Sequence, residues 1–196
     1  MTELHHPEVH CRWAPITDSL YRAYHDTEWG VPERDPVKLF AKLQLDGMQA
    51  GLSWITILRK RATILEEFEG FDPERLARWD AARIEQALTN PGIIRSPKKA
   101  EAAVSNARLY LGMVEAGEDF AEYCWSFVGG VPVVNRWSDF RDAPTQTRES
   151  EALSKDLKQR GFKFCGPVIV YAFMQAVGMV NDHETGCPRH KEVQLL

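Results

Sequence analysis

The chain has 196 residues, of which 44% are hydrophobic and 27% charged, and its formal net charge is −4. This composition is ordinary for a globular protein, no apolar run is long enough to cross a membrane, and the negative charge argues against a strongly basic, non-specific nucleic-acid binder. We expect one domain over residues 1–196, with flexible tails at 1–10 and 189–196.

The sequence pattern predicts helices along nearly the whole chain. Candidate helix starts combine a capping residue with a proline or an apolar-periodic segment; they are Asp35-Pro36, Ser53, Asp72-Pro73, Ser96-Pro97, Ser150 and Gly166-Pro167. Residues 168–177 predict a buried, apolar central helix. The one candidate strand, VPVV at 131–134, is interpreted as a loop. Strands and helices do not alternate, so we predict an all-α fold and exclude a doubly wound one.

Two thiols and two imidazoles near the ends of the chain form a candidate metal site. His183 and Cys187 are four residues apart, so one helical turn can aim both at one ion. Cys11 and His25 lie about 160 residues upstream. Two sulfur and two nitrogen ligands suit tetrahedral zinc, and a site closed by four protein ligands is structural. One shared ion would join the two ends of the chain.

Two other interpretations of these residues stay open. Cys11 and Cys187 can be buried thiols beside two surface imidazoles, or they can form a disulfide. Further histidines that could replace a ligand are His5, His6, His10 and His190. The first residues are polar and acidic and show no signal peptide. We therefore expect a cytoplasmic protein with reduced thiols, which favours a metal over a disulfide.

Aromatic residues gather around His25, in the segment YRAYHDTEWGVP at 21–32. The candidate cluster comprises Trp13, Tyr21, Tyr24, Trp29 and Trp54. Aromatic side chains most often pack in the core, and Asp46, which opens the segment DGMQAGLSW, is by itself interpretable as a cap. If the aromatic rings surround Asp46, the combination of an aromatic box and one carboxylate would bind a flat cation.

A third segment, NPGIIRSPKKAEAAVSNA at 90–107, has the pattern of two helices joined by a glycine turn. Backbone N–H groups near Gly92 and at the start of the second helix can bind a phosphate, and Lys98 and Lys99 add positive charge. An ordinary helical hairpin explains the same pattern. Other basic clusters that could contribute to a nucleic-acid surface are Arg59-Lys60-Arg61, Arg95 with Lys98 and Lys99, and Lys155, Lys158, Arg160 and Lys163.

These motifs, taken in order, resemble DNA-3-methyladenine glycosylase I. The matching segments are Cys-x-Trp at residue 11, YRAYHDTEWGVP, DGMQAGLSW, the GIIR hairpin, WSFVGGVP at 125–132 and RGFKFCGPVIVYAFMQAVGMVNDH at 160–183. The match covers roughly residues 11 to 187, and AGLSWITIL and RGFKF are its most specific strings.

The resemblance implies an all-helical DNA repair enzyme of the helix-hairpin-helix superfamily that acts on double-stranded alkylated DNA. It implies one structural zinc on Cys11, His25, His183 and Cys187, and a base pocket lined by Trp13, Tyr21, Tyr24, Trp29 and Trp54. The family usually carries glutamate where this chain has Asp46, so the carboxylate arm is one methylene shorter. Asp46 and Tyr24 are the candidate catalytic residues.

The implied reaction begins with extrusion of the damaged base from the duplex, and Leu52 can wedge into the gap. The methylated base is a cation, so its glycosidic bond is already weak, and free 3-methyladenine is the product. No lysine lies in the pocket segments, so we expect no lyase step. We expect a monomer. The alternatives are a zinc-stabilised module that binds a modified base without cleaving it, and a zinc hydrolase, which needs an open coordination position.

Overall fold

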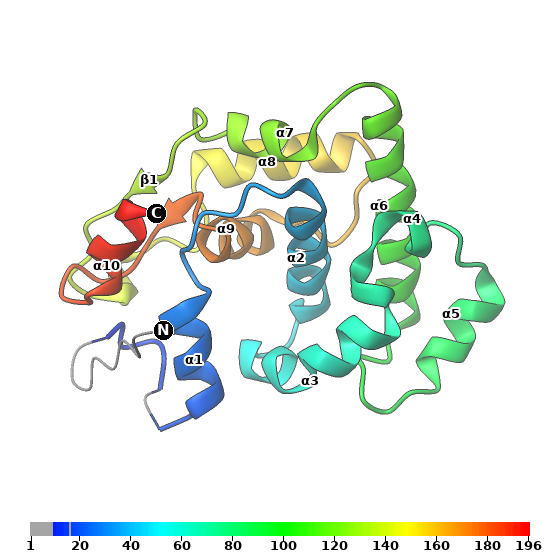
Figure 1. The fold of residues 1–196 in the computed structure, drawn as a ribbon, viewed down its shortest axis with the longest axis horizontal. Coiled ribbons are helices and arrows are strands. Elements are labelled where there is room, and N and C mark those ends of the chain that lie inside the picture. Colours follow the sequence, from blue (N-terminus) through cyan, green and yellow to red (C-terminus); the bar gives the residue numbers. More distant parts are fainter. Residues whose placement is uncertain (1–9, 16) are drawn as a thin grey trace.

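The computed structural model describes residues 10–15 and 17–196, and within them the chain is mostly helical (Figure 1). The α-helices are α1 (Ser19–Thr27), α2 (Pro36–Gln49), α3 (Trp54–Glu67), α4 (Pro73–Leu76), α5 (Ala81–Leu88), α6 (Pro97–Glu115), α7 (Phe120–Ser126), α8 (Arg148–Gln159), α9 (Pro167–Ala176) and α10 (Arg189–Glu192). Short 3₁₀ turns are η1 (Glu69–Phe71), η2 (Phe140–Asp142) and η3 (Val193–Leu195). The predicted helical fold is confirmed. None of the described helices has the length and apolarity that a membrane span requires.

Local capping explains where the helices begin. The Asp35 carboxylate accepts hydrogen bonds from the N–H groups of Val37 and Lys38, the second and third residues of α2, and Pro36 occupies the first helical position. Asp72 and Pro73 do the same for α4. The prediction that Ser150 caps α8 is wrong by one turn. Thr147 is the N-cap, and the Ser150 hydroxyl closes a capping box by accepting from the Thr147 N–H at 2.9 Å.

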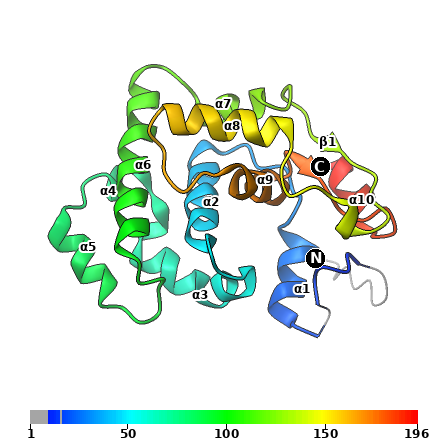
Figure 2. The same ribbon diagram turned by 180° about the vertical axis from the view of Figure 1, so that it is seen from behind.

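Helices α2 and α9 form the centre of the molecule in both views (Figures 1 and 2). On α2, the predicted core residues Leu39, Phe40 and Leu43 are all buried. Helix α9 packs against α8 on one side and α2 on another, and its Phe173 and Met174 are fully buried. The prediction of a central apolar helix is therefore confirmed. The shorter helix α1 packs against α3 and leaves room for a cavity that α2 and α9 also line.

Two sequence-based expectations are corrected near the C-terminal end. Part of the segment interpreted as a loop is strand β1 (Val133–Val134), which pairs in parallel with β2 (Val180–Asn181). The expected tail at 189–196 instead forms α10 and η3, with His190 buried and its carbonyl accepting from Asn181 Nδ2 at 2.9 Å. Pairing with a distant segment, which local patterns do not encode, stabilises both. Of the expected tail at 1–10, residues 1–9 lie outside the described residues.

The turn after α9 lies close to the backbone of the loop that follows α1 and so positions this loop. Gly178 has φ +71°, and a Cβ at this position would lie 2.5 Å from the Pro32 nitrogen. A side chain there would push the loop away and strain the backbone. The contact keeps residues 30–32 against α9, and the Trp29 carbonyl next to them accepts a hydrogen bond from His183 Nε2 at 3.0 Å.

Candidate functional site

A cavity of about 320 Å³ lies between α1, α2, α9 and the segment around η2. Its walls carry all five predicted aromatic residues together with Asp46. They are Trp13, Tyr21, Tyr24, Trp29 and Trp54. The structure therefore brings together residues that are up to 41 positions apart in the sequence, as Trp13 and Trp54 are. The volume suits one small aromatic molecule, such as a nucleobase.

The five rings form two groups that pack edge to face or tilted. Trp13 contacts Trp29 with ring centroids 4.7 Å apart and Tyr21 with centroids 5.7 Å apart. Tyr24 and Trp54 form the second group, with centroids 5.2 Å apart. Such contacts stabilise each ring position beyond simple area burial. The rings thus have both roles considered from the sequence, because they pack against one another and also line the cavity.

Asp46 lies in the cavity wall with a partner that the sequence analysis missed. The carboxylate is 2% exposed, and its Oδ1 accepts a short hydrogen bond from Lys42 Nζ, one turn earlier on α2. The Lys42 ammonium also lies 4.5 Å from the centroid of the Trp54 ring. Lys42 lines the cavity although it lies outside the segments that the sequence analysis assigned to the pocket, so the absence of lysine from those segments does not exclude a lysine at the site. The i, i+4 spacing was the available signal.

Burial and the ion pair act in opposite directions on these two groups. Burial raises the pKa of Asp46 above its ordinary value, and the charge and hydrogen bond of Lys42 partly offset that rise. Burial likewise lowers the pKa of Lys42, against the attraction of Asp46. Burial and the nearby Asp46 charge raise the pKa of Tyr24, so its phenol stays neutral. The cavity wall therefore carries one ion pair, Lys42 with Asp46, and the neutral hydroxyl of Tyr24.

Three polar atoms at the cavity are buried and have no hydrogen-bond partner among the described residues. Two are indole N–H donors, Trp13 Nε1 and Trp54 Nε1, and the third is the acceptor Asp46 Oδ2. Unpaired buried polar groups are costly and rare in native proteins. All three belong to residues that line one cavity, so its wall contains two unpaired donors and one unpaired acceptor.

A second carboxylate in the cavity wall, that of Asp182, has a different role, because protein donors occupy its hydrogen-bond acceptor positions. Asp182 accepts from Asn135 Nδ2, Trp137 Nε1, Tyr171 Oη and Gln175 Nε2 at 2.6 to 2.8 Å. Two of these donors, Tyr171 and Gln175, also line the cavity. Asp182 therefore fixes one wall and offers little to a ligand. Its donors come from different parts of the chain, and no local sequence signal indicates the network.

The four predicted metal ligands meet in a buried cluster. The ligand atoms of Cys11, His25, His183 and Cys187 all lie within 4.8 Å of one another. Cys11 Sγ is 3.4 Å from His183 Nδ1, and Cys187 Sγ is 3.7 Å from His25 Nε2. In tetrahedral zinc sites with normal bond lengths, sulfur and nitrogen ligands are about 3.6 Å apart. The cluster can therefore hold one metal ion, and both cysteines are free thiols.

Surrounding groups orient the cluster residues. His25 Nδ1 lies 2.7 Å from Asp26 Oδ1, and His183 Nε2 lies 3.0 Å from the Trp29 carbonyl. The other ring nitrogen of each histidine faces the cluster centre, which is the usual arrangement of metal-ligating imidazoles. The Glu184 N–H donates to Cys11 Sγ at 3.2 Å, which favours a thiolate.

The shifted pKa values of Cys187 and His183 also favour binding of a cation by the cluster. The hydrogen bond from the Cys11 thiol holds the pKa of Cys187 below its ordinary value, and the same contact raises the pKa of Cys11. Burial lowers the pKa of His183, which favours the neutral, metal-binding imidazole. A divalent ion bound by the cluster would stabilise both thiolates.

Other candidate ligands are placed elsewhere or not described. His190 Nε2 lies 2.7 Å from the Asn135 carbonyl, and the centroid of the His10 ring lies 5.8 Å from that of the His25 ring, with the two planes tilted by 54°. His5 and His6 lie outside the described residues.

The segment 90–107 forms the turn after α5 and the first part of α6, but two of its candidate phosphate-binding groups are used internally. The Gly92 N–H donates to Asn90 Oδ1 at 2.8 Å, and a Cβ at Gly92 would lie 2.5 Å from Thr63 Cγ2. The Lys99 ammonium donates to the carbonyls of Met48 and Ala50, at 2.8 and 2.7 Å. Gly92 thus serves close packing and Lys99 caps α2, whereas Lys98 is exposed.

Leu52 lies in the tight turn between α2 and α3 and is 40% exposed. The preceding Gly51 has φ +78°, which allows the chain to reverse direction there. Gln49 and Trp54, on either side of the turn, both line the cavity. Leu52 therefore projects from the edge of the cavity wall.

Comparison with known proteins agrees with this site. The methyladenine glycosylase family model matches residues 13–190. DNA-3-methyladenine glycosylase of Haemophilus influenzae is 50% identical over 178 residues, covering 91% of this chain and 96% of that protein. DNA-3-methyladenine glycosylase 1 of Escherichia coli is 50% identical over 177 residues, covering 90% and 94%. The chain belongs to the methyladenine glycosylase family.

Solved structures show the same fold. A crystal structure of a 3-methyladenine DNA glycosylase I superposes with a TM-score of 0.90 at 51% identity, covering 92% of this chain and 98% of that one. A variant of 3-methyladenine DNA glycosylase I in complex with 3-methyladenine has a TM-score of 0.87 at 40% identity, covering 91% and 95%. The resemblance predicted from the motifs is therefore confirmed.

The buried ion pair leads to a first prediction about stability. Asp46→Asn should lower the free energy of unfolding by up to about 3 kcal/mol, because it leaves the Lys42 ammonium buried without its counter-ion. The double variant Lys42→Met/Asp46→Asn should recover most of that loss. Urea denaturation of both variants measures the difference. A single variant as stable as the parent protein would show that the pair contributes nothing to folding.

Proposed function

We propose that this protein is a DNA repair glycosylase that flips 3-methyladenine out of alkylated double-stranded DNA and hydrolyses its glycosidic bond. The observation that carries the proposal is the aromatic cavity with two unpaired indole donors and one unpaired carboxylate oxygen. An adenine base presents ring-nitrogen acceptors and an exocyclic amino donor, so its edge can satisfy both kinds of group. The family relationship supports the same function.

Selection of the damaged base follows from its positive charge. A cation in contact with a desolvated aromatic face gains on the order of 2 kcal/mol, and the free oxygen of Asp46 adds a charge-assisted hydrogen bond. The base leaves as a neutral molecule, so the chemical step needs little assistance beyond positioning. In this mechanism Asp46 and Tyr24 contact the base, and Tyr24 does so with a protonated hydroxyl.

Extrusion of the base from the duplex costs a few kcal/mol. Leu52 is suited to fill the gap, since it is apolar, exposed and next to the cavity wall. We propose that the enzyme has no lyase step. Lys42 is the lysine that lines the cavity, and Asp46 holds its ammonium in an ion pair, which leaves no free lone pair for attack on the sugar.

Release of free base tests this function. The protein should release 3-methyladenine from alkylated duplex DNA, detected by chromatography, and leave an intact abasic strand. Borohydride added during the reaction should trap no covalent protein–DNA complex. A protein that binds the DNA or the free base and releases nothing would instead be a binding module. A trapped complex would contradict the absence of a lyase step.

We propose that the Cys-His cluster binds one structural zinc ion. Two sulfur and two nitrogen donors at tetrahedral spacing match zinc, and four protein ligands leave no open position for a catalytic water. This argues against the zinc hydrolase alternative. The ion would stabilise the contact between the segment before α1 and the segment before α10. The ligand set also requires reduced thiols, which supports a cytoplasmic location.

Removal of one ligand should remove the metal. Cys187→Ser should lose its zinc, measured by elemental analysis, and its melting temperature should fall. Cys165→Ser is the matched control, because Cys165 is also a buried free thiol and lies outside the cluster; it should keep one zinc per chain. Stoichiometric zinc retained by Cys187→Ser would contradict the ligand assignment.

We propose that the monomer binds the DNA backbone with exposed lysines near the cavity. Lys98 is the exposed residue of the predicted hairpin. A second basic group is favoured by its position, because Lys155 and Lys158 line a shallow hollow with Pro167, and the next residue, Val168, lines the cavity. Each phosphate contact releases counterions and makes binding salt-dependent.

The salt dependence of binding distinguishes the two lysine groups. Lys98→Ala should reduce the slope of log K against log salt by roughly 0.9, the value for one lost phosphate contact. Lys99→Ala is the control within the same turn, and it should lower the melting temperature and leave the slope unchanged, because its ammonium caps α2. If Lys158→Ala reduces the slope and Lys98→Ala leaves it unchanged, the DNA-binding surface is formed by α8 and α9 instead.

A further inference from the structure

We propose that Lys42 is a positioning residue for base excision: as the counter-ion of Asp46, it holds the carboxylate in its charged form and leaves Oδ2 for the base. The inference rests on the proposed function and assigns a role to a residue that the motif analysis did not identify. The pair spans one turn of α2, so a single helix places both groups on the same face.

The contacts of Lys42 with Asp46 and Trp54 support this role. Its ammonium donates to Asp46 Oδ1, and the other carboxylate oxygen is buried without a partner. The side chains are 19% and 2% exposed, so water screens the pair only weakly. The Trp54 ring, 4.5 Å away, holds the ammonium from a second direction. These two contacts hold the Lys42 ammonium beside Asp46.

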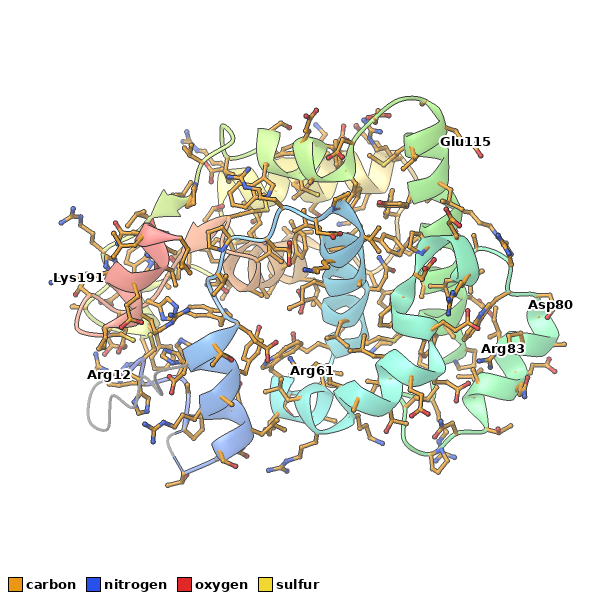
Figure 3. The ribbon with its side chains drawn as sticks, in the orientation of Figure 1. Arg12, Arg61, Asp80, Arg83, Glu115 and Lys191 are labelled. Atoms are coloured by element: carbon orange, nitrogen blue, oxygen red, sulfur yellow. The ribbon has the colours of Figure 1, made fainter. Side chains whose placement is uncertain are left out.

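Two other charged groups near the Lys42–Asp46 pair, Arg61 and Asp182, have their own partners within the protein. From α3, Arg61 reaches toward α1 (Figure 3) and donates to both Glu28 oxygens, at 2.6 and 2.9 Å. Beyond α9, Asp182 is surrounded by four hydrogen-bond donors. Tyr24 on α1 is a neutral phenol, because its pKa is raised. Lys42 is thus the cation in direct contact with Asp46 among the described residues.

The direction of the pH effect follows from burial. In this cavity burial raises the pKa of Asp46, and Lys42 opposes the rise. Without Lys42 the pKa of Asp46 would rise further, and the carboxyl group would be protonated at a higher pH. A neutral Asp46 no longer attracts the cationic lesion. Methylation fixes the charge of the lesion, so the acidic limb of the excision rate reports on the protein.

The shape of the wall determines which substitution tests the idea. Tyr24 and Lys42 line both the base cavity and a second cavity of about 290 Å³ on the other side of the wall. An alanine at position 42 would open a passage between the cavities, whereas Lys42→Met keeps the bulk of the side chain. Lys38→Met is the matched control, since Lys38 is one turn earlier on α2, 69% exposed, and 3.6 Å from Glu33.

The test is the single-turnover rate of 3-methyladenine release from alkylated duplex DNA as a function of pH. Lys42→Met should move the midpoint of the acidic limb upward by about one to three pH units, the usual effect of one close opposite charge. Lys42→Gln, which keeps a donor and loses the charge, should shift it in the same direction. Lys38→Met should follow the parent. In the Asp46→Asn background, Lys42→Met should shift nothing.

An acidic limb that stays in place in variants with parental melting temperatures would overturn the inference. If neither variant folds, carbon-13 NMR of the Asp46 carboxyl in the parent decides the point, because a protonated group at pH 7 would contradict a role for Lys42 as counter-ion. Parent protein that releases no base would refute the proposed function instead, and the NMR measurement would still determine the charge state of the pair.

Discussion

The contact between the two ends of the chain determines the shape of the cavity. Cys11 and His25 meet His183 and Cys187 in one buried cluster, and three of these four residues have a cavity residue close by in the sequence. Trp13 lies two residues after Cys11, Tyr24 precedes His25, and Asp182 precedes His183. Any rearrangement of the cluster would therefore displace three parts of the wall. Helices α1 and α10 lie on the same side of the molecule in both ribbon views (Figures 1 and 2).

Helix α2 supplies the other half of the site and is positioned differently. It is held by core packing of Leu39, Phe40 and Leu43, and its polar cavity residues are Lys42, Asp46 and Gln49. The successive separations of four and three residues place these three side chains on one helical face. A rigid helix thus presents the charged groups, while the cluster and α1 present most of the aromatic rings. Recognition of a flat cation needs both sets at once.

The buried ion pair determines the net charge of the aromatic cavity. An aromatic cavity with a lone carboxylate would carry a net negative charge, whereas Lys42 and Asp46 together are neutral. A neutral pair limits the desolvation cost of keeping a carboxylate away from water. It also leaves one oxygen and two indole N–H groups to distinguish bases by hydrogen bonding. Selectivity for a cationic base then depends on direct contact with the carboxylate and the aromatic faces, and not on a net charge of the cavity.

Local chemistry determined much of this protein from sequence alone. The carboxylate caps at Asp35 and Asp72, the apolar face of α2, and the four-residue spacing of His183 and Cys187 all depend on neighbouring residues, and so could be predicted. Lys42 also lay within reach of such reasoning, because it is four residues from Asp46 on one helix. The tertiary structure alone decided which residues of α9 face the cavity, the β1–β2 pairing, and the internal use of Lys99 and Gly92. Those features depend on contacts between segments far apart in the chain, for which the sequence carries no local signal.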